Sequence, residues 1–526
     1  MTYDYVIVGA GSAGCVLANR LSANAGKRVL LLEAGPRDWH PFIHMPAGLA
    51  KLVNRKGINW DYWTEPEPAL DNRRLWWPRG RVLGGSSSIN AMCYIRGDAR
   101  DYDDWAALSG DADWSWQNVL PYFRRAEGNG RGADTLHGAD GPLSVSDLRY
   151  RNELSDAFVA AAQAAGYPLN RDFNSTEQQG FGLYQVTQKN GARCSTAVGY
   201  LNPVRGRSNL TLRTGAAVQR VLIDGGRATG VDYRHHGRLV RAEAREVLLC
   251  GGAINSPQLL LLSGVGPADH LREHGIRVVH ELPGVGGNLQ DHLDICTLQQ
   301  CTRPVTYDRL SDTLVALQYL MKRAGPGTSN IAEAGGFVRS PLAEDARCDL
   351  QFHFIPALLD DHGRHRLPGW GFTMHACHLR PKSRGTIRLA SADPAAKASI
   401  RANYLSDPDG SDLKHLVEGL RVSREIFAAA PFDTYRGEEI FPGAGVRSEA
   451  DQIAYIRRKA ETVYHPVGSC RMGTDADAVV DAQLRVRGIG GLRVVDASVM
   501  PCLPGGNTNA PTVMIAERAA DLIAAA

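Results

Sequence analysis

The pattern of apolar positions predicts a parallel sheet that draws its strands from distant parts of the chain. Residues 5–8 are apolar, residues 16–21 continue with helical spacing, and RVLLLEAG, from Arg28, is a second apolar run. Apolar runs return at EVLLC (246–250) and at GLRVVDASVMP near the C-terminus. Strands that are apolar on both faces are typical of parallel sheets covered by helices on both sides. We therefore expect one discontinuous α/β domain.

Other segments show different patterns. NLTLRTGAAVQRVLID, from Asn209, alternates apolar and polar residues, which indicates antiparallel strands. DLQFHFI predicts a strand, and residues 311–323 predict an amphipathic helix. After the run at 246–250, Ser256 and Pro257 predict the N-cap and first turn of a helix over 258–262. Residues 38–77 are rich in Trp, Pro and Asn without clear periodicity, so we expect an excursion away from the sheet there.

A glycine turn joins the first predicted strand to the first helix. It reads Gly9-x-Gly11-x-x-Gly14, and Glu33 ends the second strand about 20 residues on. Gly9 allows the tight turn, Gly11 lets the backbone approach a pyrophosphate, and Gly14 permits close helix–strand contact. The helix N-terminus offers N–H groups to the phosphates. These residues predict a dinucleotide site and leave FAD and NAD both open.

Composition narrows the class of protein. The formal net charge of +3, without a long basic run, gives no indication of a nucleic-acid partner. The ten cysteines form no CxxC pair, so we expect reduced, mostly buried thiols rather than a zinc or disulfide framework. Because the first predicted strand starts within five residues of Met1, we expect no signal peptide. The apolar stretch 247–266 is interrupted by polar residues and is not a membrane span. We expect a cytoplasmic protein, with peripheral attachment to the cytoplasmic membrane left open.

Four further segments identify a family. They are GRVLGGSSSINAMCYIRG (80–97), GAINSPQLLLLSGVG (252–266), VYHPVGSCRMG (463–473) and GNTNAPT (506–512). Together they resemble the signature and C-terminal catalytic segments of the glucose–methanol–choline (GMC) flavin oxidoreductases, over essentially the full chain. The likeness is greatest to the alcohol dehydrogenases of bacterial alkane degradation, with choline dehydrogenases next.

The resemblance implies an α/β fold with two domains, in keeping with a chain of 526 residues. A Rossmann-type FAD-binding domain of the p-hydroxybenzoate hydroxylase type would comprise residues 1–152, 195–300 and 455–526. An α+β substrate domain with an antiparallel sheet would comprise 153–194 and 301–454. The implied cofactor is FAD, and the implied cofactor-binding residues are Gly9, Gly11, Ser12, Ala13, Gly14, Glu33, Ala34, Val82, Gly85, Ser86, Asn90, Met92, Val218, Tyr464, Asp496 and Ala497. Ile89 stands where some choline oxidases have a histidine bonded to FAD, so we expect non-covalent FAD.

The resemblance also implies the catalytic residues. His465 matches the family's catalytic histidine, a natural base for an alcohol proton, and Asn509 matches its hydrogen-bonding partner. The chain has 16 histidines, and those between 353 and 378 lack a metal-ligand spacing, so we expect no metal site. Three features stay open between a functional and a structural role: Glu333, the aromatic segment Asn59–Pro68, and the helix at 311–323, which either docks on lipid or packs on its own protein.

The expected function is FAD-dependent oxidation of primary, aliphatic or otherwise apolar, alcohols to aldehydes. Hydride would pass to flavin N5, with His465 as the base, and electrons would leave to a quinone or another acceptor rather than NAD. Oxygen as acceptor and choline as substrate are the alternatives. Hydroxynitrile lyases and fatty-acid photodecarboxylases of the family are less favoured, because His465 and Asn509 are retained. The sequence does not indicate an oligomeric state.

Overall fold

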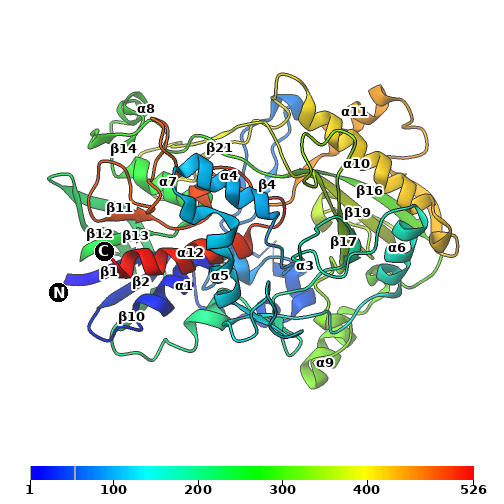
Figure 1. The fold of residues 1–526 in the computed structure, drawn as a ribbon, viewed down its shortest axis with the longest axis horizontal. Coiled ribbons are helices and arrows are strands. Elements are labelled where there is room, and N and C mark those ends of the chain that lie inside the picture. The colour runs from blue at the N-terminus through cyan, green and yellow to red at the C-terminus, as the bar shows by residue number, and fades with distance from the viewer. Residues whose placement is uncertain (1, 53–54, 366) are drawn as a thin grey trace.

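The computed structural model describes residues 2–52, 55–365 and 367–526. Two seven-stranded sheets lie toward opposite ends of an elongated molecule, and Figure 1 shows the N-terminal sheet at the left and the second sheet at the right. Each sheet has its own apolar core. The predicted two-domain α/β architecture is confirmed.

The first sheet has the strand order β10-β2-β1-β13-β12-β11, with β24 beside β13. Its strands are β1 (Thr2–Val8), β2 (Val29–Glu33), β10 (Leu210–Thr214), β11 (Ala216–Asp224), β12 (Arg227–His235), β13 (Arg238–Leu249) and β24 (Leu492–Val494). The apolar runs named above lie in β1, β2, β13 and β24, which pair in parallel. β10 also pairs in parallel with β2, so the antiparallel prediction holds only for β11, which pairs with β12. Alternation of apolar and polar residues indicates a strand with one buried face. It does not determine whether the strand pairs in parallel or antiparallel with its neighbour.

Three helices beside this sheet bring residues from distant parts of the chain close together. They are α1 (Ser12–Leu21), α7 (Gly252–Leu262) and α12 (Asn509–Ala524). Arg20 of α1 bonds Glu517 of α12, so the first and last helices lie side by side (Figure 1). α7 begins at Gly252 rather than at 258, because Asp496 accepts the Gly252 N–H at 2.8 Å and so satisfies the helix start.

The second sheet is antiparallel, with the order β22-β16-β19-β18-β17-β7 and β23 beside β16. Its strands are β7 (Gly180–Leu183), β16 (Leu293–Cys301), β17 (Ala334–Val338), β18 (Leu350–Ile355), β19 (Gly371–His378), β22 (Arg436–Phe441) and β23 (Glu461–Thr462). Its core includes residues of α6 (Glu153–Ala164) and α10 (Ser411–Ala428). β16 and β23 belong to this sheet, although the predicted boundaries assigned them to the other domain. The remaining boundaries stay predictions.

Shorter elements connect and border the two sheets. The helices are α2 (Pro41–His44), α3 (Leu49–Leu52), α4 (Ala99–Ser109), α5 (Trp116–Ala126), α8 (Ala268–Glu273), α9 (Asp312–Lys322) and α11 (Glu449–Lys459). The strand pairs are β3 (Tyr62–Trp63) with β4 (Trp76–Trp77), β5 (Glu127–Asn129) with β6 (Leu143–Val145), β8 (Gln188–Lys189) with β9 (Ala192–Arg193), β14 (Val265–Gly266) with β15 (His280–Glu281), and β20 (Thr386–Arg388) with β21 (Ser399–Arg401). All ten cysteines are free thiols. Across the described ranges, every helix is too short or too polar to cross a membrane.

Candidate active site

The predicted glycine turn is required by close backbone approaches. A Cβ on Gly9, whose φ is +102°, would lie 2.5 Å from the Cys250 carbonyl oxygen, and one on Gly14 would lie 1.9 Å from the Gly9 oxygen. Gly11 precedes the first residue of α1, and its would-be Cβ faces Gly85. The turn therefore leaves the N–H groups at the start of α1 close to a second glycine-rich wall.

Glu33 lies at the end of β2 with its carboxylate buried. Its oxygens accept the N–H groups of Ala10 at 2.9 Å and Gly35 at 2.8 Å. Burial raises the pKa of Glu33 to about 7, against these two hydrogen bonds. The carboxylate is fixed in position and keeps lone pairs for a ribose diol.

The second wall is the turn at residues 84–92. A Cβ on Gly85 (φ +53°) would lie 2.7 Å from the Gly11 Cα. Asn90 accepts hydrogen bonds from Arg193 at 2.8 Å and from the Met92 N–H at 3.1 Å, which holds Met92 at a φ of +62°. Val82 does not line this space. Its side chain is fully buried and packs with Ile43, Leu52, Ile58 and Ile89, so its contact with the cofactor stays a prediction.

One cavity of about 1570 Å³ connects these walls with the antiparallel sheet. This exceeds the roughly 300–1,000 Å³ of an ordinary small-molecule pocket, so it has room for a dinucleotide together with a substrate. Gly14 packs helix against strand behind the lining. The cavity is lined by sixteen of the predicted residues: Gly9, Gly11, Ser12, Ala13, Glu33, Ala34, Gly85, Ser86, Asn90, Met92, Val218, Tyr464, His465, Asp496, Ala497 and Asn509. The fixed carboxylate of Glu33, the paired glycine walls and the cavity volume fit FAD.

Asp496, from the C-terminal part of the chain, lines the same cavity. Its carboxylate accepts hydrogen bonds from the Gly252 N–H and from the hydroxyls of Ser256 and Ser498. Burial raises its pKa. Asp496 thereby joins β24 to the start of α7, at the ends of two neighbouring parallel strands, where α/β proteins bind their ligands.

His465 is held in a single tautomer by His292. The His292 Nε2 lies 3.2 Å from the Leu379 carbonyl oxygen, which only accepts, so this nitrogen carries a hydrogen. Burial lowers the pKa of His292 to about 3, so the ring is neutral and its Nδ1 carries no hydrogen. The His465 Nδ1, 3.0 Å away, is therefore the donor of that hydrogen bond. Burial and the neighbouring His292 hold the pKa of His465 well below its usual range, so its Nε2 is an unprotonated acceptor.

Asn507 is the amide that faces this acceptor. Its Oδ1 accepts from Gln351 at 3.0 Å, which turns its Nδ2 toward the His465 Nε2 at 3.2 Å. Asn507 and His465 both line the cavity. Asn509, the predicted partner, instead accepts the Ser12 hydroxyl at 2.8 Å. The prediction that Asn509 bonds His465 is wrong, because α12 begins at Asn509 and its first turn directs that side chain toward α1.

Asp291, which the sequence did not single out, fixes the backbone of His465. Its Oδ1 accepts the His465 N–H at 2.7 Å, while its other oxygen accepts the hydroxyls of Thr462 and Tyr404. Burial raises its pKa to about 6. Arg79 donates to the Tyr464 carbonyl at 2.7 Å, and Tyr464 has a φ of +68°. The Tyr464–His465 segment is therefore anchored by both Asp291 and Arg79.

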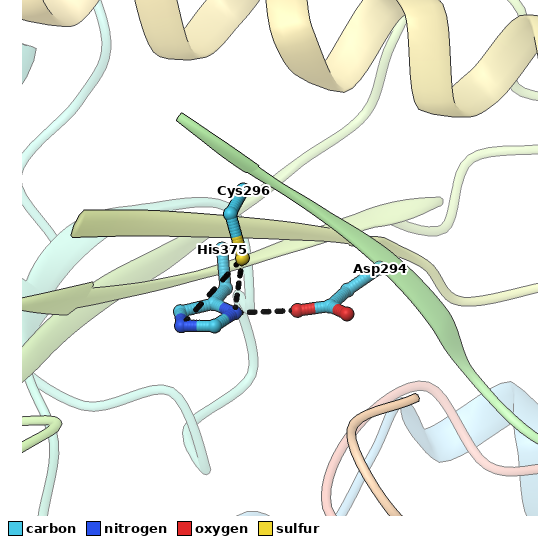
Figure 2. Close-up of side chains that lie close together, drawn as sticks. All are labelled: Asp294, Cys296 and His375. Carbon is cyan, nitrogen blue, oxygen red and sulfur yellow. Dashed lines mark hydrogen bonds and ion pairs between the residues drawn. The ribbon is translucent and has the colours of Figure 1, made fainter. Parts of the chain in front are cut away.

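A second polar group lies in the antiparallel sheet beside the cavity (Figure 2). The His375 Nδ1 lies 2.6 Å from the Asp294 Oδ2 and 3.1 Å from the Cys296 Sγ. Their ligand-type atoms all lie within 4.8 Å of one another, an arrangement also found around metal ions. Cys296 and His375 are register partners on β16 and β19, so linear spacing gave no signal of the group. His375 lines the cavity, and the Asp294–His375 hydrogen bond accounts for the closeness.

The features left open by the sequence have distinct positions. Glu333 is buried and accepts hydrogen bonds from Asn152, Ser155, Ser329 and Tyr307, which is a structural role. Trp60 and Tyr62 of the aromatic segment line the cavity, as do the histidines His353, His362 and His365.

Comparisons with known proteins show similarity over nearly the whole chain. Family models described as GMC oxidoreductase match residues 3–294 and 381–516. An alcohol dehydrogenase [acceptor] of Pseudomonas putida is 52% identical over 99% of this chain and 95% of its own. The mitochondrial choline dehydrogenase of Mus musculus is 48% identical over 99% of this chain and 89% of its own. Among solved structures, pyridoxine 4-oxidase from Mesorbium loti superposes with a TM-score of 0.91 and 33% identity, over 99% of both chains.

Proposed function

Because the chain belongs to the GMC oxidoreductase family and is an FAD enzyme, we propose that it oxidises primary, aliphatic or otherwise apolar, alcohols to aldehydes. The observation that carries the proposal is the unprotonated His465 Nε2, which faces a cavity shared by the dinucleotide cradle and the antiparallel sheet. A neutral imidazole at this position is suited to accept a hydroxyl proton.

The residues around the cavity would have different roles in this reaction. An alcohol hydroxyl would give its proton to the His465 Nε2, while the Asn507 amide donates to the oxygen and stabilises its developing negative charge. His292 keeps the proton-accepting nitrogen on the cavity side. Bound FAD supplies the two-electron acceptor for the hydride that leaves the alcohol carbon. Ile89 lines the cavity without a nucleophilic atom, which supports non-covalent binding of FAD.

The charge at the cavity wall favours a neutral substrate. Behind the part of the wall that β19 forms, the Asp294 Oδ2 is engaged by His375 at 2.6 Å, and His375 rather than Asp294 lines the cavity. At this part of the wall a quaternary ammonium would meet the His375 imidazole instead of the Asp294 carboxylate. Ile331, Ala332 and Ile355 add an apolar lining. Choline is the second candidate, supported by the 48% identity to a choline dehydrogenase.

The acceptor is the remaining part of the proposal. The name of the Pseudomonas putida relative supports a non-NAD acceptor such as a quinone. Oxygen is the alternative, because a solved structure of the same fold belongs to an oxidase.

Anaerobic mixing of the FAD-loaded protein with hexanol, benzyl alcohol and choline tests these points through the flavin absorbance. We expect the apolar alcohols to bleach the flavin faster than choline, and a quinone analogue to restore colour faster than air. The substitution His465→Asn should retain FAD and slow bleaching by on the order of a hundredfold or more. His236→Asn, in an exposed hairpin, is the matched control. Faster bleaching by choline would overturn the substrate, and rapid recovery in air with peroxide would overturn the acceptor.

A further inference from the structure

Helix α9 presents an apolar face that the rest of the described chain leaves uncovered. Leu314, Leu317, Leu320 and Met321 are 66%, 50%, 73% and 66% exposed, and Leu310, just before the helix, is 40% exposed. Leu310, Leu314, Leu317 and Met321 follow one another at intervals of four and three residues, so they share one side of the helix. Most other exposed apolar side chains are scattered, which is normal, whereas a contiguous patch marks an interaction surface.

The opposite side of α9 attaches it firmly to the protein. Tyr319 is buried and donates its hydroxyl to the His44 carbonyl at 2.9 Å, and Lys51 pairs with Asp312 at 2.7 Å. Figure 1 shows α9 projecting from the lower edge of the molecule, away from both sheets. The apolar face is therefore directed outward by fixed contacts.

Positive charge borders this face. Lys322 and Arg323 end the helix and Arg309 precedes it, and all three are exposed. The acidic groups of the segment are already engaged, because Asp312 pairs with Lys51 and Asp308 accepts the backbone N–H groups of Leu358 and Gly371. An apolar face with basic residues at its ends is the pattern of helices that lie in the headgroup region of anionic membranes.

The same segment borders an opening of the large cavity, because Leu310 and Asp312 line the cavity and are also exposed to solvent. Leu310, Asp312, Val315 and Pro326 line the cavity, whereas Leu314, Leu317, Leu320 and Met321 do not. We propose that α9 docks the protein on an anionic phospholipid surface, with the cavity entrance turned toward the bilayer. Docking then lets an apolar alcohol pass from lipid to the site; this consequence rests on the proposed function, whereas docking itself does not.

Vesicle co-sedimentation of the FAD-loaded protein tests the inference. Wild type should pellet with phosphatidylcholine vesicles that contain phosphatidylglycerol, more weakly with pure phosphatidylcholine, and less at high salt. The triple substitution L314S/L317S/L320S should weaken vesicle affinity on the order of a hundredfold, because three apolar side chains are removed from the contact. Leu239→Ser, at a 64% exposed leucine of β13, is the matched control and should pellet like wild type.

A second measurement separates docking from catalysis. The triple variant should reduce its flavin with a water-soluble short alcohol as fast as wild type, because none of the three side chains lines the cavity. Absence of turnover in both proteins, with vesicle binding intact, would overturn the proposed function alone. Failure of wild type to pellet, equal pelleting by the triple variant, or a dimer that the triple substitution dissolves would overturn the docking proposal.

Discussion

At the scale of single residues, two asparagines separated by one position have different neighbours. Asn507 faces the His465 Nε2, and Asn509 bonds Ser12 beside the glycine turn. We expect Asn507→Ala to lower the flavin reduction rate by roughly a hundredfold with FAD still bound, because the substrate oxygen loses its donor. Asn509→Ala should weaken FAD retention while the loaded protein reacts within a few-fold of wild type. The FAD content of each purified variant and its rate of single-turnover flavin reduction test these expectations. Slow reduction in Asn509→Ala together with FAD loss in Asn507→Ala would restore Asn509 as the partner of His465.

The residues around His465 also show what the sequence was able to predict. His465 itself stands in a family motif, so its place on the cavity wall was foreseeable. Asn507 and Asn509 lie in the same GNTNAPT segment, and only the start of α12 decides which of them points to the imidazole. Asp291 and His292 lie more than 170 residues before His465 and reach it through the pairing of β16 with β23, for which no local pattern exists.

At the scale of elements, the predicted FAD site lies where the glycine turn at residues 9–14 contacts the turn at residues 84–92. Gly85→Ala should reduce the FAD content of the purified protein by about tenfold or more, because its Cβ would meet the Gly11 backbone at 2.7 Å. Gly225→Ala is a close control, since Gly225 has the same φ of +53° but nothing within 4 Å of its would-be Cβ. Both changes cost about 1 kcal/mol of folding free energy through the backbone conformation. Retention of full FAD by Gly85→Ala would contradict the steric role.

Element types were predicted better than element partners. The buried runs at β1, β2 and β13 and the strand DLQFHFI were recognisable because burial leaves a direct mark on sequence. The direction of β10, the start of α7 and the sheet to which β16 belongs depend on contacts from elsewhere in the chain. The burial of the Val82 side chain among Ile43, Leu52, Ile58 and Ile89 also depends on such distant contacts.

At the scale of the whole molecule, a buried ionic network joins the two predicted domains. Arg96 and His137 contact Glu127 within residues 1–152, and His137 also contacts Asp172, 2.9 Å away in the predicted substrate domain. Burial lowers the pKa of His137, but hydrogen bonds to Asp172 and Glu127 outweigh it and raise the pKa to about 9. Because the folded protein holds this proton more tightly than an unfolded chain with a pKa of about 6.5, the contribution is complete below pH ~6.5 and lost as pH rises through about 9.

Thermal unfolding of His137→Asn against wild type measures this contribution. We expect the Tm deficit of the variant to be greatest near about pH 6 and to shrink toward about pH 10, because only the wild type loses a stabilising charge over that range. His236→Asn, in an exposed hairpin outside the network, should show a small deficit that does not change with pH. A deficit of His137→Asn that stays constant across the range would mean that His137 contributes by packing alone, and the two domains would then be joined without a pH-dependent contact.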